Sequence, residues 1–333
     1  GTQGRAICYP ALVGECSQGD RVLLNTTAVD LGLGTGGAHF VVARAGEGVA
    51  LDNPSGGHIM KLRYTPLQRD VLAVEESASP HHAVMRTATS LDGMPVVCCG
   101  LHSQVPLVAA AVKATDSSLR VAYCMTDFAA LALGLSDVLG SARTAGLIDT
   151  TISCGQAFGG DLEAVNLHSG LLAARHAARA HVAVVAIGPG VVGTATPFGH
   201  GGVSQGEAIN AAAALGGTPV AVLRVSFADK RERHRGVSHH TLTALSKVAL
   251  APAKVAIPSL PAEFSDAIES ALGEAGVWAL HERADSSAGR VPPPSLRGVE
   301  VTSMGRSMSD DPAFYAASFA AGDIASAIAQ RVL

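Results

Sequence analysis

His102 and Asp127 are the residues whose positions most favour acid–base chemistry. Each follows an apolar run, MPVVCCGL before His102 and RVAYCM before Thr126-Asp127. A histidine oriented by a carboxylate is the usual general base of a catalytic site. Consecutive strands of a βαβ unit often lie side by side, so we expect these two side chains to approach one another. Ser103 or Cys154 can then supply the nucleophile.

Helix capping is the alternative interpretation of the same residues. Ser103 precedes a predicted helix over Gln104–Lys113, and Asp127 precedes another helical pattern. Serine and aspartate oxygens commonly accept hydrogen bonds from the free N–H groups at a helix N-terminus. The sequence leaves catalysis and capping open for both residues.

A glycine-rich loop follows the run VAVVAI. The segment Gly188–Gly193 has the letters of a GxGxxG dinucleotide fingerprint, but Thr194–Gly202 separates it from the next helix, and no acidic residue ends the next strand. We therefore predict no nicotinamide site. Such a long loop beside the helix that starts near Ser204 suggests anion binding, and an unliganded surface loop is the alternative. The expected anion ligands are Gly188, Gly190, Gly193, Thr194 and Thr196.

The strongest basic stretch is Asp229–His240, with four cationic side chains and three histidines in twelve residues. Arg235 is suited to hold a carboxylate or phosphate with two hydrogen bonds. His239 is a second acid–base candidate, and His240 is expected to contact the ligand. Gln156, which follows the run TTIS, is placed at the same edge as a ligand-binding residue. A solvated run of charges is the alternative interpretation.

Metal binding must be considered because the chain has 13 histidines. His234, His239 and His240 match no common zinc spacing. Ligands can nevertheless come from separate strand ends, for instance His102 and Asp127 with His239. From the sequence we assign no metal ligand and no cofactor.

The elements that must position these residues form an α/β pattern. Five apolar runs each end on a polar residue or glycine and pass into a helical pattern, which predicts a mainly parallel sheet. Ligands of such sheets bind outside the carboxyl ends of the strands. The runs are MPVVCCGL, RVAYCM, TTIS, VAVVAI and PVAVLRV, and further helices are predicted over Asp161–Ala178, Ser204–Leu215 and His239–Leu250 and from Pro312, with a strand over Val299–Ser303.

The N-terminal residues read differently. Short β-type runs (AICYPAL, RVLLNT and AHFVVARA) separated by glycine-rich turns predict a small antiparallel β module over residues 1–60. The turn-rich segment Asp52–Gly57 is the expected boundary, and residues 61–333 are expected to form the α/β domain.

The composition disfavours two classes of partner. The net charge is −4 and aromatic residues make up 4% of the chain, whereas a nucleic-acid surface needs a basic field and stacking rings. No apolar run approaches the roughly 18 residues that span a bilayer. We therefore predict neither nucleic-acid nor membrane partners.

The content of charged residues suggests an oligomer, and the cysteine content suggests a cellular compartment. Charged residues make up 16%, against a typical value of about 25%. A poorly charged exterior favours association, so we expect a homo-oligomer. Six cysteines without a CxxC pair are typical of a reducing compartment, which favours the cytoplasm.

Several segments resemble the bacterial domain-of-unknown-function 3866 family. They are Gly19–Ala43, Leu62–Glu76, Gly155–His176, Gly188–Ala208 and Arg233–Leu245. Because no biochemical role is assigned to that family, the resemblance implies a fold and a lineage but carries over no catalytic residue. It also implies further β-type residues before Ala6–Leu12, so the N-terminal module is expected to be incomplete here.

Two functions from different classes remain as expectations. The leading one is an enzyme that hydrolyses or transfers a group of a small anionic metabolite, phosphorylated metabolites included, because polar residues gather at the predicted strand ends. The alternative is a non-catalytic metabolite sensor or an oligomeric scaffold for protein partners. Whether the chain is an enzyme is left open by its sequence.

Overall fold

The computed structural model describes residues 3–32, 37–46, 56–128, 130–286 and 293–333. The chain separates into two compact units, Gly1–Leu72 and Ala73–Leu333. Residues 52–55 of the expected boundary segment lie outside the described residues. Each unit is described by itself below.

The smaller unit contains a three-stranded sheet with the order β1-β3-β2, built from β1 (Arg5–Ile7), β2 (Val22–Asn25) and β3 (Ala38–Arg44). β2 pairs antiparallel with β3, as expected for a β module, whereas β1 pairs parallel with it, so the sheet is mixed. Two one-turn helices, α1 (Pro10–Val13) and α2 (Thr27–Asp30), and an antiparallel hairpin of β4 (Ile59–Lys61) and β5 (Arg69–Val71) complete the unit.

The larger unit is built on an eight-stranded sheet in which every pair is parallel, with the order β15-β14-β11-β6-β10-β7-β8-β9. The α/β prediction is therefore confirmed. All five apolar runs form strands, and the fifth splits into β11 and a separate two-residue strand, β12, that pairs with β13. The strands are β6 (Pro95–Cys98), β7 (Val121–Thr126), β8 (Thr150–Cys154), β9 (Leu162–Ala164), β10 (Val182–Ile187), β11 (Thr218–Ala221), β12 (Val225–Ser226), β13 (Gly236–Val237), β14 (Lys254–Ile257) and β15 (Glu282–Asp285).

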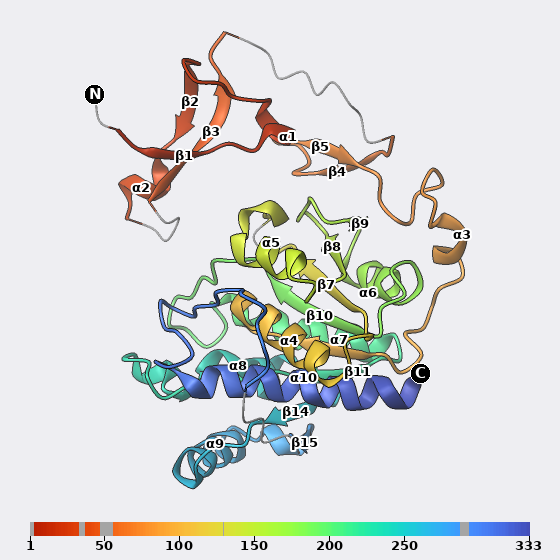
Figure 1. The fold of residues 1–333 in the computed structure, drawn as a ribbon, viewed down its shortest axis with the longest axis vertical. Coiled ribbons are helices and arrows are strands. Elements are labelled where there is room, and N and C mark those ends of the chain that lie inside the picture. The colour runs from red at the N-terminus through yellow and green to blue at the C-terminus, as the bar shows by residue number, and fades with distance from the viewer. Residues whose placement is uncertain (1–2, 33–36, 47–55, 129, 287–292) are drawn as a thin grey trace. The chain divides into compact units, whose positions relative to one another are not determined.

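Helices cover both faces of this sheet (Figure 1). Alternate strand residues point to opposite faces, so Val97 and Cys99 join one hydrophobic core while Val96 and Cys98 join the other. The first core contains residues of α4 (Val105–Thr115), α5 (Asp137–Thr144) and α10 (Pro312–Val332), and the second contains residues of α6 (Leu167–His176), α7 (Ser204–Ala214) and α9 (Ala262–Glu274). The shorter helices are α3 (His82–Met85) and α8 (His239–Thr243), the latter continued by a π-helical turn over Ala244–Val248.

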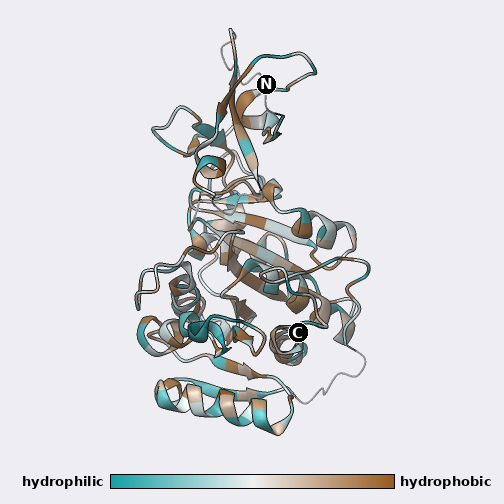
Figure 2. Cartoon of the chain, turned by 90° about the vertical axis from the view of Figure 1, so that its left-hand side faces the viewer, coloured by the Kyte–Doolittle hydropathy of each residue, from teal (hydrophilic) through white to brown (hydrophobic). Residues whose placement is uncertain are grey.

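The hydropathy of each strand and helix reflects how many of its faces are buried in the two cores. Figure 2 shows the central strands of the larger sheet mostly in brown, because both of their faces are buried, whereas α9 at the bottom carries teal and brown bands. Strands buried on both faces are continuous apolar runs instead of alternating ones. The continuous apolar runs in the sequence therefore indicated that both faces of these strands are buried.

Two of the predicted elements were wrong in detail. The helix expected from Asp161 begins at Leu167, because the residues before it form β9 and pair with β8. Asp161 accepts hydrogen bonds from the backbone and hydroxyl of Thr151. The segment Val299–Ser303 forms no strand; its two valines are buried in the core that contains α4 and α10.

α4 and α10 pack against each other (Figure 1), and Gly322 and Ala111 lie at their contact. An added Cβ on Gly322 of α10 would lie 2.5 Å from the carbonyl oxygen of Val108 and 2.6 Å from the Cβ of Ala111. The alanine-rich faces of both helices are buried within this unit. No helix in the described ranges, the 21-residue α10 included, has the apolar length that crossing a bilayer requires.

We expect Gly322→Ala to lower the free energy of unfolding by about 1–3 kcal/mol, because overpacking a tight core forces neighbouring backbone apart. Urea unfolding followed by circular dichroism measures this change. Gly273→Ala in α9 is the matched control, since an added Cβ there meets nothing within 4 Å. That variant should gain about 0.5–1 kcal/mol from helix propensity. Equal effects of the two substitutions would contradict the close α4–α10 contact.

Candidate functional site

Polar side chains gather at the carboxyl edge of the eight-stranded sheet, as the strand pattern predicted. His102 follows β6 and Asp127 follows β7, but β10 lies between these strands. The expected approach of the two side chains is therefore not found: they have different hydrogen-bond partners. Asp127 accepts a bond of 3.4 Å from the backbone N–H of Gln156, and an added Cβ on Gly155 would collide with its carboxylate.

His102 is instead paired with a serine that the sequence did not single out. Its Nε2 lies 2.6 Å from Oγ of Ser136, and its Nδ1 lies 3.1 Å from the hydroxyl of Tyr123. The tyrosine hydroxyl in turn lies 3.4 Å from the carbonyl oxygens of Ala186 and Ile187 at the end of β10. The three side chains form one continuous hydrogen-bonded chain, the Ser136–His102–Tyr123 chain.

Burial sets the protonation state of this chain. His102 and Ser136 are each 7% exposed. Desolvation lowers the pKa of His102 to about 4, so the imidazole is neutral at pH 7 and can accept a proton. Burial also raises the pKa of Tyr123 far above its usual value, so the phenol stays protonated. The chain therefore contains a neutral base beside a hydroxyl group.

The local fold holds His102 in place. His102, Ser103 and Gln104 form a 3-10 turn between β6 and α4. The side-chain oxygen of the buried Gln104 accepts hydrogen bonds of 3.0 Å from the backbone of Gly100 and Leu101, and its amide donates to the carbonyl of Leu223. These bonds fix the turn on two strand ends, and the orientation of the imidazole follows.

Ser136 caps α5 and lines an open cavity. Its Oγ accepts a 3.2 Å hydrogen bond from the backbone N–H of Leu139. The cavity has a volume of about 790 Å³, and Arg143 and Arg297 are among its lining residues. Arg143 forms an ion pair with Asp161. Arg297 donates to the carbonyls of Ala145 and Gly146 and has no carboxylate partner among the described residues.

The loop after β10 is held together by its own polar groups. The hydroxyl of Thr194 contacts that of Thr196 at 2.9 Å and donates to the carbonyl of Gly199, whose N–H donates to Thr196. An added Cβ on Gly188 would lie 2.8 Å from Leu131, so this glycine permits close packing. Gly190 has a φ of 91°, a backbone angle that favours glycine. Each of these residues thus has a structural reason for its type, and their anion-binding role stays a prediction.

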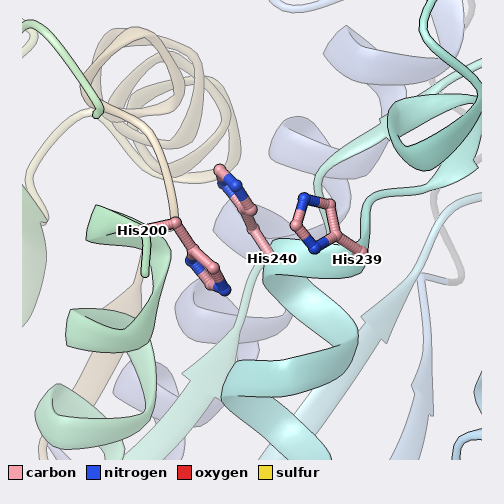
Figure 3. Close-up of side chains that lie close together, drawn as sticks. All are labelled: His200, His239 and His240. Atoms are coloured by element: carbon pink, nitrogen blue, oxygen red, sulfur yellow. The ribbon is translucent and has the colours of Figure 1, made fainter. Parts of the chain in front are cut away.

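Four imidazoles lie close together where this loop ends. They belong to His200, His234, His239 and His240, here called the histidine cluster. The rings of His200 and His240 stack with centroids 3.8 Å apart, and that of His239 lies 4.4 Å from His240. Figure 3 shows His240 between the other two labelled rings. His234 donates to or accepts from the hydroxyl of Ser238 at 2.7 Å. His239 and His240 were predicted from the sequence, whereas the loop residue His200 was not.

Burial and nearby arginines keep the histidine cluster neutral. Desolvation, followed by the charges of Arg224 and Arg231, lowers the pKa of His234 to about 3. The pKa values of His200, His239 and His240 are lowered as well, in each case mainly by desolvation. Neutral imidazoles are the form that binds metal ions.

Arg224 is a buried cation beside the histidine cluster. It is 7% exposed, and its guanidinium lies 3.3 Å from Nδ1 of His240. Desolvation lowers its pKa to about 10, and within the described ranges it forms no ion pair. Nearby, Asp229 forms ion pairs with Arg231 and Arg306 instead. Sequence reasoning missed Arg224 because it lies inside the apolar run PVAVLRV.

The remaining predicted residues lie at or near the same edge without forming one cluster. Arg235 is exposed between His234 and β13, Ser103 is half-buried in the 3-10 turn, and Gln156 follows β8. Cys154 is buried under α6, where an added Cβ on Gly170 would collide with its sulfur. The roles assigned to these residues, and to Asp127 and His239, stay predictions.

Comparison with known proteins identifies the lineage of the chain. The model of the family described as "Protein of unknown function (DUF3866)" matches residues 5–322. Searches of the curated proteins and of the solved structures found no match. The match includes both units and every residue discussed at the carboxyl edge. The chain belongs to the DUF3866 family.

Proposed function

We propose that the larger unit is a hydrolase or acyl transferase for a small anionic ester, thioester or amide. Ser136 is the nucleophile and His102 the general base in this proposal. The observation that carries it is the 2.6 Å separation between Oγ of Ser136 and Nε2 of His102, beside a cavity that Ser136 lines. A serine with a base at hydrogen-bond distance and a third group on that base is the arrangement of an activated nucleophile.

The hydrogen-bond directions required for this chemistry are mutually consistent. When Oγ–H of Ser136 donates to Nε2 of His102, the proton of the neutral imidazole is on Nδ1 and points at the oxygen of Tyr123. The tyrosine then donates toward the end of β10. Tyr123 thereby selects the tautomer that leaves Nε2 free to take the serine proton.

The reaction follows from these directions. Oγ of Ser136 attacks the carbonyl carbon of the substrate while Nε2 of His102 takes the hydroxyl proton. His102 then gives this proton to the leaving group as the acyl–Ser136 ester forms. In hydrolysis, water attacks that ester with His102 again as base, and the acid product and free serine are released. In acyl transfer, an acceptor alcohol, thiol or amine replaces water.

The cavity supports an anionic substrate. At about 790 Å³ it is within the usual size range of small-molecule sites. Arg297 lines it and forms no ion pair with a carboxylate among the described residues, although Asp137 also lines the cavity. A carboxylate or phosphate of the substrate can pair with Arg297, because a guanidinium binds either group with two hydrogen bonds.

The second candidate is a non-catalytic sensor that binds the same kind of metabolite in the same cavity. The low exposure of Ser136, at 7%, favours it, because a nucleophile must reach its substrate. The two functions differ in one respect. Only the enzyme forms a covalent bond at Ser136.

We expect a fluorophosphonate probe, which reacts with activated serines, to label Ser136, with mass spectrometry locating the adduct. Ser136→Ala should abolish labelling, and His102→Gln should slow it by about 10²–10⁴-fold, the usual contribution of a general base. Ser141→Ala is the matched control, since Ser141 lines the same cavity. Ser103→Ala tests the nucleophile expected from the sequence and should leave labelling unchanged. Ligand-induced stabilisation without labelling would favour the sensor.

The labelling rate should also report the buried state of His102. Its lowered pKa of about 4 predicts a rate that is constant from about pH 8 to pH 5 and falls as His102 is protonated near pH 4. The rate constant of labelling is measured across this range, with Trp278 fluorescence confirming that the protein stays folded. An inflection near 6.5, the ordinary value for histidine, would show that His102 is not desolvated.

A further inference from the structure

Two buried ring nitrogens in the histidine cluster have no hydrogen-bond partner: Nδ1 of His200 and Nε2 of His239. Burying a polar nitrogen without a partner is unfavourable, and folded proteins leave few such atoms. Two of them in touching imidazoles call for a ligand that both nitrogens can share. A cation that accepts lone pairs meets this requirement.

The tautomer of His200 leaves its lone pair on the unpartnered nitrogen. Nε2 of His200 lies 3.0 Å from the carbonyl oxygen of Pro197. A carbonyl only accepts hydrogen bonds, so Nε2 carries the proton and Nδ1 carries the lone pair. An imidazole whose second nitrogen donates to a backbone carbonyl is the usual form of a metal-binding histidine.

We propose that His200, His239 and His240 bind a divalent transition-metal ion with the ligand preferences of zinc. One ring nitrogen from each lies within 4.8 Å of the others, and no other set of three such groups occurs in the described part of the chain. Zinc–nitrogen bonds of about 2.0–2.1 Å place tetrahedral ligands roughly 3.4 Å apart. A ring of the stacked pair must therefore turn before the three nitrogens seen in Figure 3 reach this spacing.

Glycines make room for these rings. An added Cβ on Gly193 would lie 3.3 Å from Nε2 of His240, and one on Gly202 would lie 2.8 Å from the Cβ of His240. Both glycines belong to the loop after β10 or to the turn that ends it. The glycine content of this segment thus follows from the close approach of its backbone to the histidine cluster.

Arg224 is the contact that must change when the ion enters. The stacked rings of His200 and His240 are inclined by only 6°, so their in-plane lone pairs cannot meet at one point until a ring turns. The hydrogen bond from Arg224 to Nδ1 of His240 is long, at 3.3 Å, and the ion takes this nitrogen in its place.

The released guanidinium determines the kind of ligand that joins the ion. Three histidines leave the fourth zinc position for water or a ligand atom. Arg224 stays beside that position as a buried cation without a carboxylate partner in the described residues. The ion and Arg224 together therefore select an anion. This site shares no residue with the Ser136–His102–Tyr123 chain, so it goes beyond the proposed function.

The test uses the full chain after removal of bound metal with a chelator. Zn²⁺ is titrated by calorimetry and Co²⁺ by its visible absorption, with Mg²⁺, which prefers oxygen ligands, as the negative control. We expect one Zn²⁺ per chain and tetrahedral Co²⁺ bands. His200→Gln and His239→Gln should each weaken zinc binding more than tenfold, since loss of an outer-shell partner alone costs about 10–100-fold.

His168→Gln is the matched control, because His168 is an exposed histidine of α6 outside the histidine cluster. It should bind zinc with the affinity of the unmodified protein. Zinc binding as tight in His200→Gln and His239→Gln as in the unmodified protein would overturn the proposal.

Discussion

Backbone groups at the carboxyl ends of β6, β10 and β11 remain buried where the strands diverge and lose their sheet partners. Buried N–H and C=O groups must be hydrogen-bonded, so side chains have to replace the missing strand. Gln104 bonds to the backbone after β6, and Gln205 donates to the carbonyls of Cys98 and Val222 at 2.8 and 2.7 Å. The hydroxyl of Tyr123 donates to a carbonyl at the end of β10. The polar edge of this sheet depends on that constraint.

The same constraint explains why the residues of the two candidate sites also hold the backbone in place. The hydroxyl of Tyr123 contacts backbone carbonyls on one side and His102 on the other. Ser136 caps α5 with the oxygen that also contacts His102. His200 contacts the carbonyl of Pro197 with Nε2, and its ring stacks on that of His240. Groups that satisfy the backbone are already ordered before a ligand arrives, which reduces the entropy cost of binding.

The sequence predicted the α/β class and the polar residues at the strand ends from local patterns, and it failed where a residue's contacts depend on a distant partner. The apolar runs indicated the strands because strands buried on both faces need continuous apolar side chains. β9 was missed because its three residues are a strand only through pairing with β8. Ser136 was not singled out from the sequence, because its contact with His102 joins residues 34 positions apart. Arg224 was hidden in an apolar run, since nothing local indicates that its neighbour is His240.

By itself the sequence determined that a doubly covered parallel sheet forms, and that polar residues follow its strands. Both properties are periodic or local, so a single strand or turn carries them. Only the tertiary structure decided the strand order, which places β10 between β6 and β7 and separates His102 from Asp127. It also decided which residues meet: His102 with Ser136, and His200 with His239 and His240. The physical reason is that strand order and side-chain convergence arise from packing between segments far apart in the chain, and no local pattern encodes such packing.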